Sequence, residues 1–392
     1  MGGTELWYNG GVSETQMEAE AMRLNIIAEI WNAALSHSLR RAAFSALSIA
    51  AFAATGDAFA EAFRMPGLPA PVYYHALHSI GDGDGCEVAV VLVHGWNDGV
   101  REIEETPYLA EALAEVTPKG IPAPFIVAPM FPTFLAMKKH GASPDGRALW
   151  NASWGKDLTK AGLPDDDWRG GGDADGVPLS SFEVIDAILR ALGDRRLYPN
   201  LRRVLLTGFS AGGQFVGRYV AVGEGRVRDG VEVVYAAMGP STFLLFDPGT
   251  IWHYGIKGRP RYPARLSDAQ ILDNLSSRRI WHACGTADVN VGGALDRSPA
   301  AVAQGANRYE RFLNFKEHVK KYPRWAEQIT FHEFKGLGHD TCRAHADRDF
   351  IAYVMGGLAR HPAGRDSAPA GNLRGQVPDA MRGPALRDVR LE

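Results

Sequence analysis

The chain has 392 residues, of which 46% are hydrophobic and 22% are charged. This composition is typical of a globular protein long enough to bury one large core, and it excludes a fibre or an extended repeat array. The formal net charge of −3 gives no electrostatic reason to expect a nucleic acid or an anionic membrane as a partner, so we expect neither.

The N-terminal 60 residues have the features of a secretory signal. The pair Arg40-Arg41 precedes an apolar run over 42–54, and an Ala-Phe-Ala tripeptide follows at 58–60. This order predicts a signal peptide cleaved after Ala60, and hence a secreted or periplasmic protein. The apolar run has about 13 residues, whereas a membrane span needs about 20, so we expect no membrane anchor after cleavage. A buried helix is the alternative.

The remaining chain divides into one domain and a tail. We expect residues 61–360 to form a single catalytic domain, with an irregular insertion over about 130–179. Residues 361–392 are rich in Pro, Gly, Arg and Ala without periodicity, which indicates a disordered tail.

Short apolar runs alternate with segments that favour helices. Buried parallel strands are predicted at 87–93, 125–129, 204–207, 231–237, 280–284 and 328–334. Helices are predicted at 103–116, 180–192 and 341–358, and the second opens with a Ser180-x-x-Glu183 capping box. The alternation predicts an α/β fold with a mostly parallel sheet and helices on both faces.

The insertion contains tryptophans within little regular pattern. We expect it to frame the substrate as a lid or pocket wall, with Trp154 and Trp168 as substrate contacts. Ordinary loop packing is the alternative for these rings. Asp173-x-Asp175-Gly176 resembles half of a calcium loop, but the other ligands are missing, so we interpret it as a solvated turn and expect no metal.

A sharp turn is predicted where the strand at 204–207 ends. Gly208-Phe209-Ser210-Ala211-Gly212 has the Gly-x-Ser-x-Gly spacing that exposes a serine between a strand and a helix. Both glycines are needed because a Cβ would collide with the neighbouring backbone. The N–H of Ala211, at the start of the helix, is a candidate to stabilise negative charge beside Ser210.

A second such donor is predicted after the strand at 87–93. His94-Gly95 lets the backbone bend, so that the N–H of Trp96 points into the site as the other oxyanion donor. We interpret His94 itself as a structural residue that fixes the loop by hydrogen bonding.

A serine hydroxyl needs a base, and the base needs a carboxylate that orients it. Ser210, Asp288 and His339 each follow a predicted strand, and they occur in the order nucleophile, acid, base. Asp247 is the main rival for the acid. Asp340 adjoins His339 too closely to reach its Nδ1 and is expected to cap the final helix.

Three cysteines, Cys86, Cys284 and Cys342, are too few for a disulfide scaffold. Separate buried thiols are the default. One bridge between Cys284 and Cys342 is the alternative, because each lies beside a loop that carries a candidate catalytic residue and an exported chain can form disulfides.

The chain resembles the α/β-hydrolase superfamily over about residues 72–358. The motifs that carry the resemblance are His94-Gly95, Gly208-Phe209-Ser210-Ala211-Gly212, Gly285-Thr286-Ala287-Asp288 and Gly338-His339. They match, in order, the family's oxyanion loop, nucleophile elbow, acid loop and histidine loop. The stretches 180–184, 208–214 and 239–242 further resemble poorly characterised secreted hydrolases of bacteria and fungi.

These features predict a carboxylesterase-like serine hydrolase that forms an acyl-enzyme and needs no cofactor. Small-molecule or polymeric esters are the expected substrates, because an alkoxide leaves more easily than an amine. An amidase or peptidase with the same triad is the alternative within enzymes. A binding protein that has kept the fold without turnover is the alternative outside them.

Overall fold

The computed structural model describes residues 62–63, 68–76, 85–96, 105–133, 148–151, 167–292 and 295–356. The predicted signal peptide, the predicted tail and Trp154 lie outside these residues. The described strands are β1 (Ala62–Phe63), β2 (Val72–Ala76), β3 (Val88–Val93), β4 (Phe125–Met130), β5 (Asp173–Ala174), β6 (Val177–Ser180), β7 (Arg203–Phe209), β8 (Glu232–Met238), β9 (Ile280–Gly285) and β10 (Ile329–Phe334).

One large sheet organises the molecule, with eight strands in the order β1-β2-β4-β3-β7-β8-β9-β10. Every neighbouring pair from β4 to β10 is parallel, whereas β1 and β2 join antiparallel at one edge. The six predicted strands are these six parallel ones, and their ends agree within about two residues. The predicted α/β fold class is therefore confirmed.

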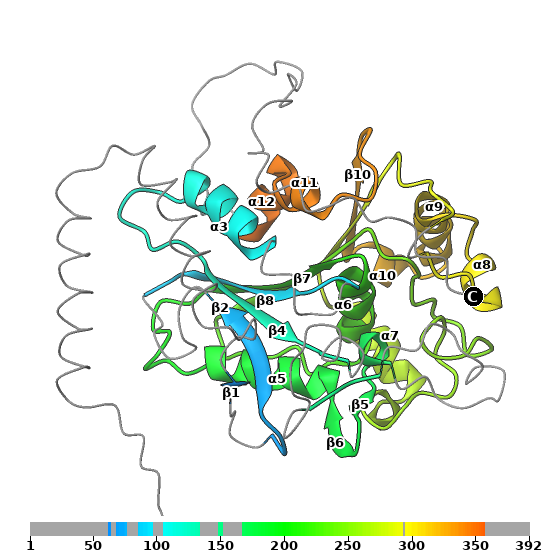
Figure 1. The fold of residues 1–392 in the computed structure, drawn as a ribbon, viewed down its shortest axis with the longest axis horizontal. Coiled ribbons are helices and arrows are strands. Elements are labelled where there is room, and N and C mark those ends of the chain that lie inside the picture. Colours follow the sequence, from blue (N-terminus) through cyan, green and yellow to red (C-terminus); the bar gives the residue numbers. More distant parts are fainter. Residues whose placement is uncertain are drawn as a thin grey trace, which may run out of the picture.

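Helices cover both faces of this sheet (Figure 1). The described helices are α3 (Glu105–Val116), α5 (Ser181–Leu192), α6 (Ala211–Val222), α7 (Asp268–Leu275), α8 (Pro299–Val302), α9 (Arg308–Val319), α10 (Pro323–Ala326), α11 (Thr341–His345) and α12 (Arg348–Met355). Two short 3-10 helices, η2 (Trp168–Gly170) and η3 (Pro263–Arg265), lie in the connections.

The core has two halves, one on each side of the sheet. Val91 and Leu206 belong to the half that also contains side chains of α5, α6, α7 and α9. Their strand neighbours Val90 and Leu205 belong to the half packed against α3 and α12. Successive strand residues point to opposite faces, so strands buried on both faces must be apolar throughout.

The described parts of the predicted insertion include both core residues and exposed ones, while its role as a lid or pocket wall stays a prediction. Trp150 and Trp168 are 3% and 2% exposed. β5 and β6 form a short antiparallel hairpin. Its Asp173 carboxylate receives two 2.8 Å hydrogen bonds from Arg261, which gives this predicted solvated turn a structural ion pair.

Two of the predicted helices can be compared with the structure at their N-termini. Ser180 caps α5 through its hydroxyl, and the Glu183 carboxylate accepts a hydrogen bond from the Ser180 N–H at 2.7 Å, which confirms the capping box. The predicted final helix is instead two, α11 and α12. Asp347 begins the second by accepting hydrogen bonds from the N–H groups of Asp349 and Phe350.

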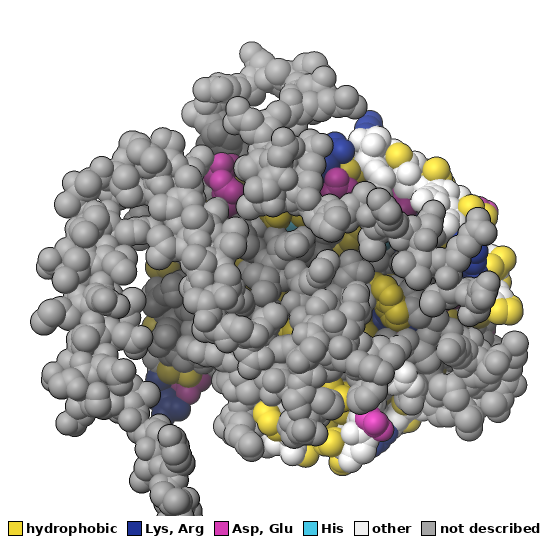
Figure 2. Space-filling view, viewed as in Figure 1, with side chains coloured by type: hydrophobic (Ala, Val, Ile, Leu, Met, Phe, Trp, Pro, Cys, Tyr) yellow, Lys and Arg dark blue, Asp and Glu magenta, His cyan; other side chains and the backbone are white. Residues whose placement is uncertain are grey.

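On the face drawn in Figure 2, the described acidic and basic side chains are interspersed, in keeping with the small net charge. Within the described ranges, no helix combines the length and the apolarity that crossing a bilayer requires. No disulfide joins Cys86, Cys284 or Cys342, so the alternative of a Cys284–Cys342 bridge is wrong. Cys86 and Cys284 are buried as expected, whereas Cys342 is partly exposed.

Candidate active site

Ser210 lies at the tip of a tight turn between β7 and α6. Its backbone has φ 56° and ψ −113°, and it is the one non-glycine residue of the described chain with positive φ. Such a conformation is strained for a residue with a side chain, and it persists only where surrounding structure enforces it. Here the backbone of two flanking glycines packs so closely against neighbouring backbone that the turn is held in this conformation. A Cβ on Gly212 would lie 2.2 Å from the Val93 carbonyl oxygen, and one on Gly208 would lie 2.6 Å from the Gly212 carbonyl carbon.

The three predicted catalytic side chains meet above the carboxyl ends of their strands. His339 Nε2 lies 2.9 Å from Ser210 Oγ, and His339 Nδ1 lies 2.6 Å from Asp288 Oδ2. Ser210 follows β7, Asp288 follows β9, and His339 follows β10. Parallel strands end at one edge of the sheet, which brings residues distant in sequence together there.

The hydrogen bonds define the protonation of the neutral His339 ring. A carboxylate only accepts, so Nδ1 carries the hydrogen and donates to Asp288. Nε2 is then an acceptor for the Ser210 hydroxyl. The side chain of Asp288 is 1% exposed, while that of His339 is 29% exposed. The pair therefore reaches from the interior to solvent, with the basic nitrogen at its outer end.

The acid and histidine loops are packed directly on each other. The Ala287 N–H donates to the Leu337 carbonyl at 2.9 Å. A Cβ on Gly285 would lie 2.1 Å from that same oxygen, so only glycine fits. This close approach explains why glycine occurs at the end of β9, and it fixes Asp288 relative to His339.

A buried cation, which no sequence pattern predicts, lies behind the acid. Arg308, the first residue of α9, places a guanidinium nitrogen 3.6 Å from Asp288 Oδ1. Their side chains are 3% and 1% exposed. Burial lowers the pKa of Arg308, while the facing Asp288 carboxylate raises it. No motif surrounds Arg308, so the available signal was only that Asn307 can cap a helix that begins at Arg308.

The rival acids have other roles. Asp247 closes its own turn, accepting hydrogen bonds from Thr250 Oγ1 at 2.6 Å and the Gly249 N–H at 2.8 Å, and these lower its pKa. Asp340 accepts from the Arg343 N–H at 3.0 Å and caps α11, as predicted. The structure thus brings Asp288, and neither of these, to His339.

His94 fixes the first loop, which confirms its structural role. Its Nε2 accepts the Phe131 N–H at 3.0 Å, so the hydrogen is on Nδ1, which donates to the Gly95 carbonyl at 2.8 Å. Trp96 follows in a bend, with the Arg169 guanidinium 5.0 Å from its ring centre. Ala211 is the first residue of α6, where an N–H has no acceptor within the helix.

The expected substrate contact at Trp168 is corrected to a core position. Its ring is 2% exposed, stacks on Phe131 with centroids 5.4 Å apart, and lies 4.6 Å from the His94 ring. An indole enclosed in this way supports the loop that carries His94 rather than an open pocket. The position of Trp168 in the sequence could not distinguish a substrate contact from ordinary packing.

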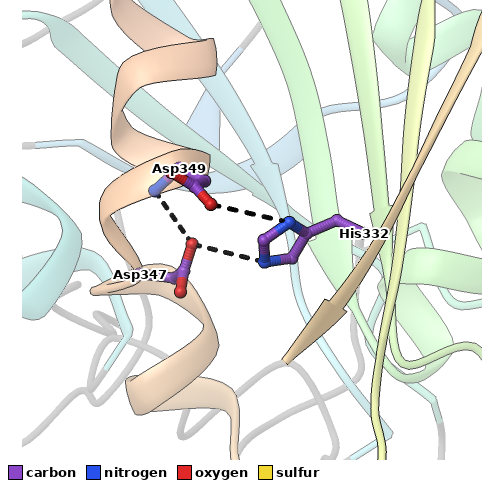
Figure 3. A group of neighbouring side chains, drawn as sticks. All are labelled: His332, Asp347 and Asp349. Carbon is purple, nitrogen blue, oxygen red and sulfur yellow. Dashed lines mark hydrogen bonds and ion pairs between the residues drawn. The ribbon is translucent and has the colours of Figure 1, made fainter. Parts of the chain in front are cut away.

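One group of described side chains has the composition of a metal site: His332, Asp347 and Asp349 (Figure 3). Its geometry fits ion pairs better. His332 Nε2 lies 3.7 Å from Asp347, and Nδ1 lies 3.8 Å from Asp349. A single cation coordinates one imidazole nitrogen, whereas these carboxylates face different nitrogens. Asp347 is also occupied in capping α12.

Comparison with known proteins identifies the architecture. No family model matches the chain, and no curated protein matches it. A poly(aspartic acid) hydrolase from Sphingomonas sp. KT-1 has a TM-score of 0.51 at 19% identity, covering 75% of this chain and 98% of that chain. LpqC, a poly(3-hydroxybutyrate) depolymerase from Bordetella parapertussis, gives 0.48 at 18% identity, covering 73% and 88%. With the parallel sheet and its strand order, the first likeness shows that the chain has the fold of the α/β-hydrolase superfamily.

Proposed function

We propose that the protein is a serine hydrolase that cleaves carboxylic esters through an acyl-enzyme. The observation that carries this proposal is the continuous contact from Asp288 through His339 to Ser210, at 2.6 and 2.9 Å. The strained turn that presents Ser210 supports it, because strain of this kind concentrates at functional sites.

The geometry supports a two-step acyl transfer. Ser210 Oγ attacks the ester carbonyl carbon while its proton moves to His339 Nε2, and Asp288 stabilises the resulting imidazolium. The tetrahedral intermediate then collapses, and the departing alkoxide takes the proton from Nε2. Water attacks the acyl-enzyme, giving its proton to Nε2, and the returned proton restores the Ser210 hydroxyl as the carboxylic acid leaves.

The oxyanion of each intermediate is assigned to two backbone donors. The Ala211 N–H lies next to the nucleophile, and the Trp96 N–H would approach from the loop that His94 fixes. Losing one donor of this kind costs about 3 kcal/mol of transition-state stabilisation. Trp154 stays a proposed substrate contact.

Esters are proposed over amides because of the leaving group. Either leaving group would take its proton from His339 Nε2, but an alkoxide departs more readily than an amine, and a peptidase would also need subsites along the chain. Export is part of the proposal. β1 begins at Ala62, so cleavage after Ala60 would leave the first strand of the sheet intact. N-terminal sequencing of the protein released by its host tests this.

The function is tested by p-nitrophenol release from acetyl, butyryl and octanoyl esters. We expect turnover by the wild-type chain and background rates for Ser210→Ala and His339→Ala, with unchanged circular dichroism. Turnover that survives in Ser210→Ala contradicts the proposal. Absence of turnover on esters, together with cleavage of p-nitroanilides, would favour the amidase.

A further inference from the structure

The two oxygens of the Asp288 carboxylate have different interaction partners. Oδ2 accepts the His339 Nδ1 hydrogen at 2.6 Å. Oδ1 is buried and accepts no hydrogen bond from any described residue, but it faces the Arg308 guanidinium at 3.6 Å. The backbone supports the same approach, because the Tyr309 N–H donates to the Asp288 carbonyl at 3.3 Å. The start of α9 is therefore attached directly to the acid loop.

A buried carboxylate needs compensation of its charge. Transfer of an ionised carboxyl group from water into a protein interior costs several kcal/mol, unless an opposite charge or hydrogen bonds offset it. Oδ1 is buried away from bulk solvent and accepts no hydrogen bond from the described chain. The cation at 3.6 Å supplies the compensation, because a guanidinium stays protonated even when buried.

We propose that Arg308 is a positioning residue for the reaction, whose charge compensates the buried Asp288 carboxylate and thereby sets the proton affinity of the Asp288–His339 pair. The inference rests on the proposed function, since it assigns the pair to catalysis. Arg308 acts through Asp288 and has no contact with substrate in this account.

The other charged or titratable groups described near Asp288 do not compensate the charge of its carboxylate. Cys284 lies in β9 next to its last residue, but burial raises the pKa of its thiol and keeps it neutral. Glu333 on β10 accepts a 2.9 Å hydrogen bond from the Tyr309 hydroxyl. Arg311 lies one turn further along α9 and donates to the carbonyl oxygens of Gly305, Ser241 and Asp296.

Removing the cation has a definite consequence for the pH profile. Asp288 and His339 are coupled, so the pair takes up one proton with a pKa that belongs to both. A nearby positive charge opposes that uptake, wherever the proton resides. Loss of Arg308 therefore raises the pKa of the pair, and the acidic limb of kcat/KM moves to higher pH by about one unit.

The test is the pH dependence of kcat/KM for ester hydrolysis by the full chain. Arg308→Met should move the acidic limb upward by about one unit, while Arg308→Lys, which keeps a cation, should stay closer to wild type. Arg311→Met removes a buried arginine of the same helix and is the matched control, which should lose stability but move the limb much less. An unmoved limb in Arg308→Met, or an equal shift in Arg311→Met, overturns the proposal.

Two further measurements keep the proposal open to refutation. If Arg308→Met does not fold, the double variant Asp288→Asn with Arg308→Met should fold, because no uncompensated charge remains in it. Failure of the double variant to fold would show that Arg308 is merely structural and would overturn the proposal. If the wild type does not hydrolyse esters, NMR titration of His339 still decides. A titration raised in Arg308→Met supports the positioning role, and an unchanged one refutes it.

Discussion

At the scale of single residues, the Ser210 turn depends on the absence of two side chains. Gly212 passes the Val93 carbonyl so closely that a Cβ would lie 2.2 Å from its oxygen. Backbone cannot yield as a flexible side chain does, so a methyl group there displaces β3 or the start of α6. Both movements change the position of the nucleophile.

We predict that Gly212→Ala lowers kcat/KM at least about a hundredfold, since a misplacement of about 1 Å has effects of this size. Gly217→Ala, in the same helix, is the control. A Cβ there meets His282 Cε1 at 3.6 Å, an ordinary contact, and alanine favours a helix by up to about 1 kcal/mol. Kinetics and urea unfolding of both variants check this. Equal activities would contradict it.

The candidate site shows which residues a sequence can reveal. Ser210, Asp288 and His339 were predictable because each lies in a glycine-containing loop after an apolar strand. Arg308 was not, because its role arises from the position at which α9 begins relative to the acid loop. That position depends on tertiary packing, for which the sequence has no local signature.

At the scale of elements, two helices begin with the same capping box in different surroundings. Ser180 before α5 is 0% exposed, and its hydroxyl also donates to the Gly171 carbonyl at 2.7 Å. Ser267 before α7 is exposed. Solvent can replace the lost hydrogen bonds at Ser267 but not at Ser180.

We predict that Ser180→Ala lowers the free energy of unfolding by about 2 kcal/mol or more, and Ser267→Ala by about 1 kcal/mol or less. Urea denaturation of the two variants measures both. Equal losses would show that burial of the cap adds nothing.

The parallel strands were predictable because burial on both faces requires uninterrupted apolar runs. β1 and β2 at the edge were not, since Ala62–Phe63 and Val72–Ala76 are short and carry no such run. The division between α11 and α12 was missed because helical spacing continues through it. Asp347 decides the break by capping the second helix.

At the scale of the whole molecule, two buried histidines couple folding to pH. Burial lowers the pKa of His282 to about 3 and that of His345 to about 4, from the ordinary value of 6.5. Below pH 6.5 the unfolded chain binds protons that the folded chain refuses. The stability is therefore present above pH 6.5 and is lost as the pH falls toward these values, by about 1.4 kcal/mol per pH unit for each histidine.

We predict that His282→Phe flattens this dependence. The His282 ring already lies among aromatic rings, 4.9 Å from Phe315 and 5.8 Å from Phe243, which suits phenylalanine. Between pH 7 and 5 the variant should lose about 2 kcal/mol less free energy of unfolding than the wild type. Urea unfolding at the two pH values checks this, and parallel losses would contradict the assignment to His282.

The most direct measurement of the central claim is covalent labelling of the nucleophile. A fluorophosphonate reacts with a serine that a neighbouring base activates, and peptide mass spectrometry locates the adduct. We predict one adduct, on Ser210, absent in Ser210→Ala and strongly slowed in His339→Ala. No adduct on the folded wild-type protein, or an adduct at another residue, would contradict the account.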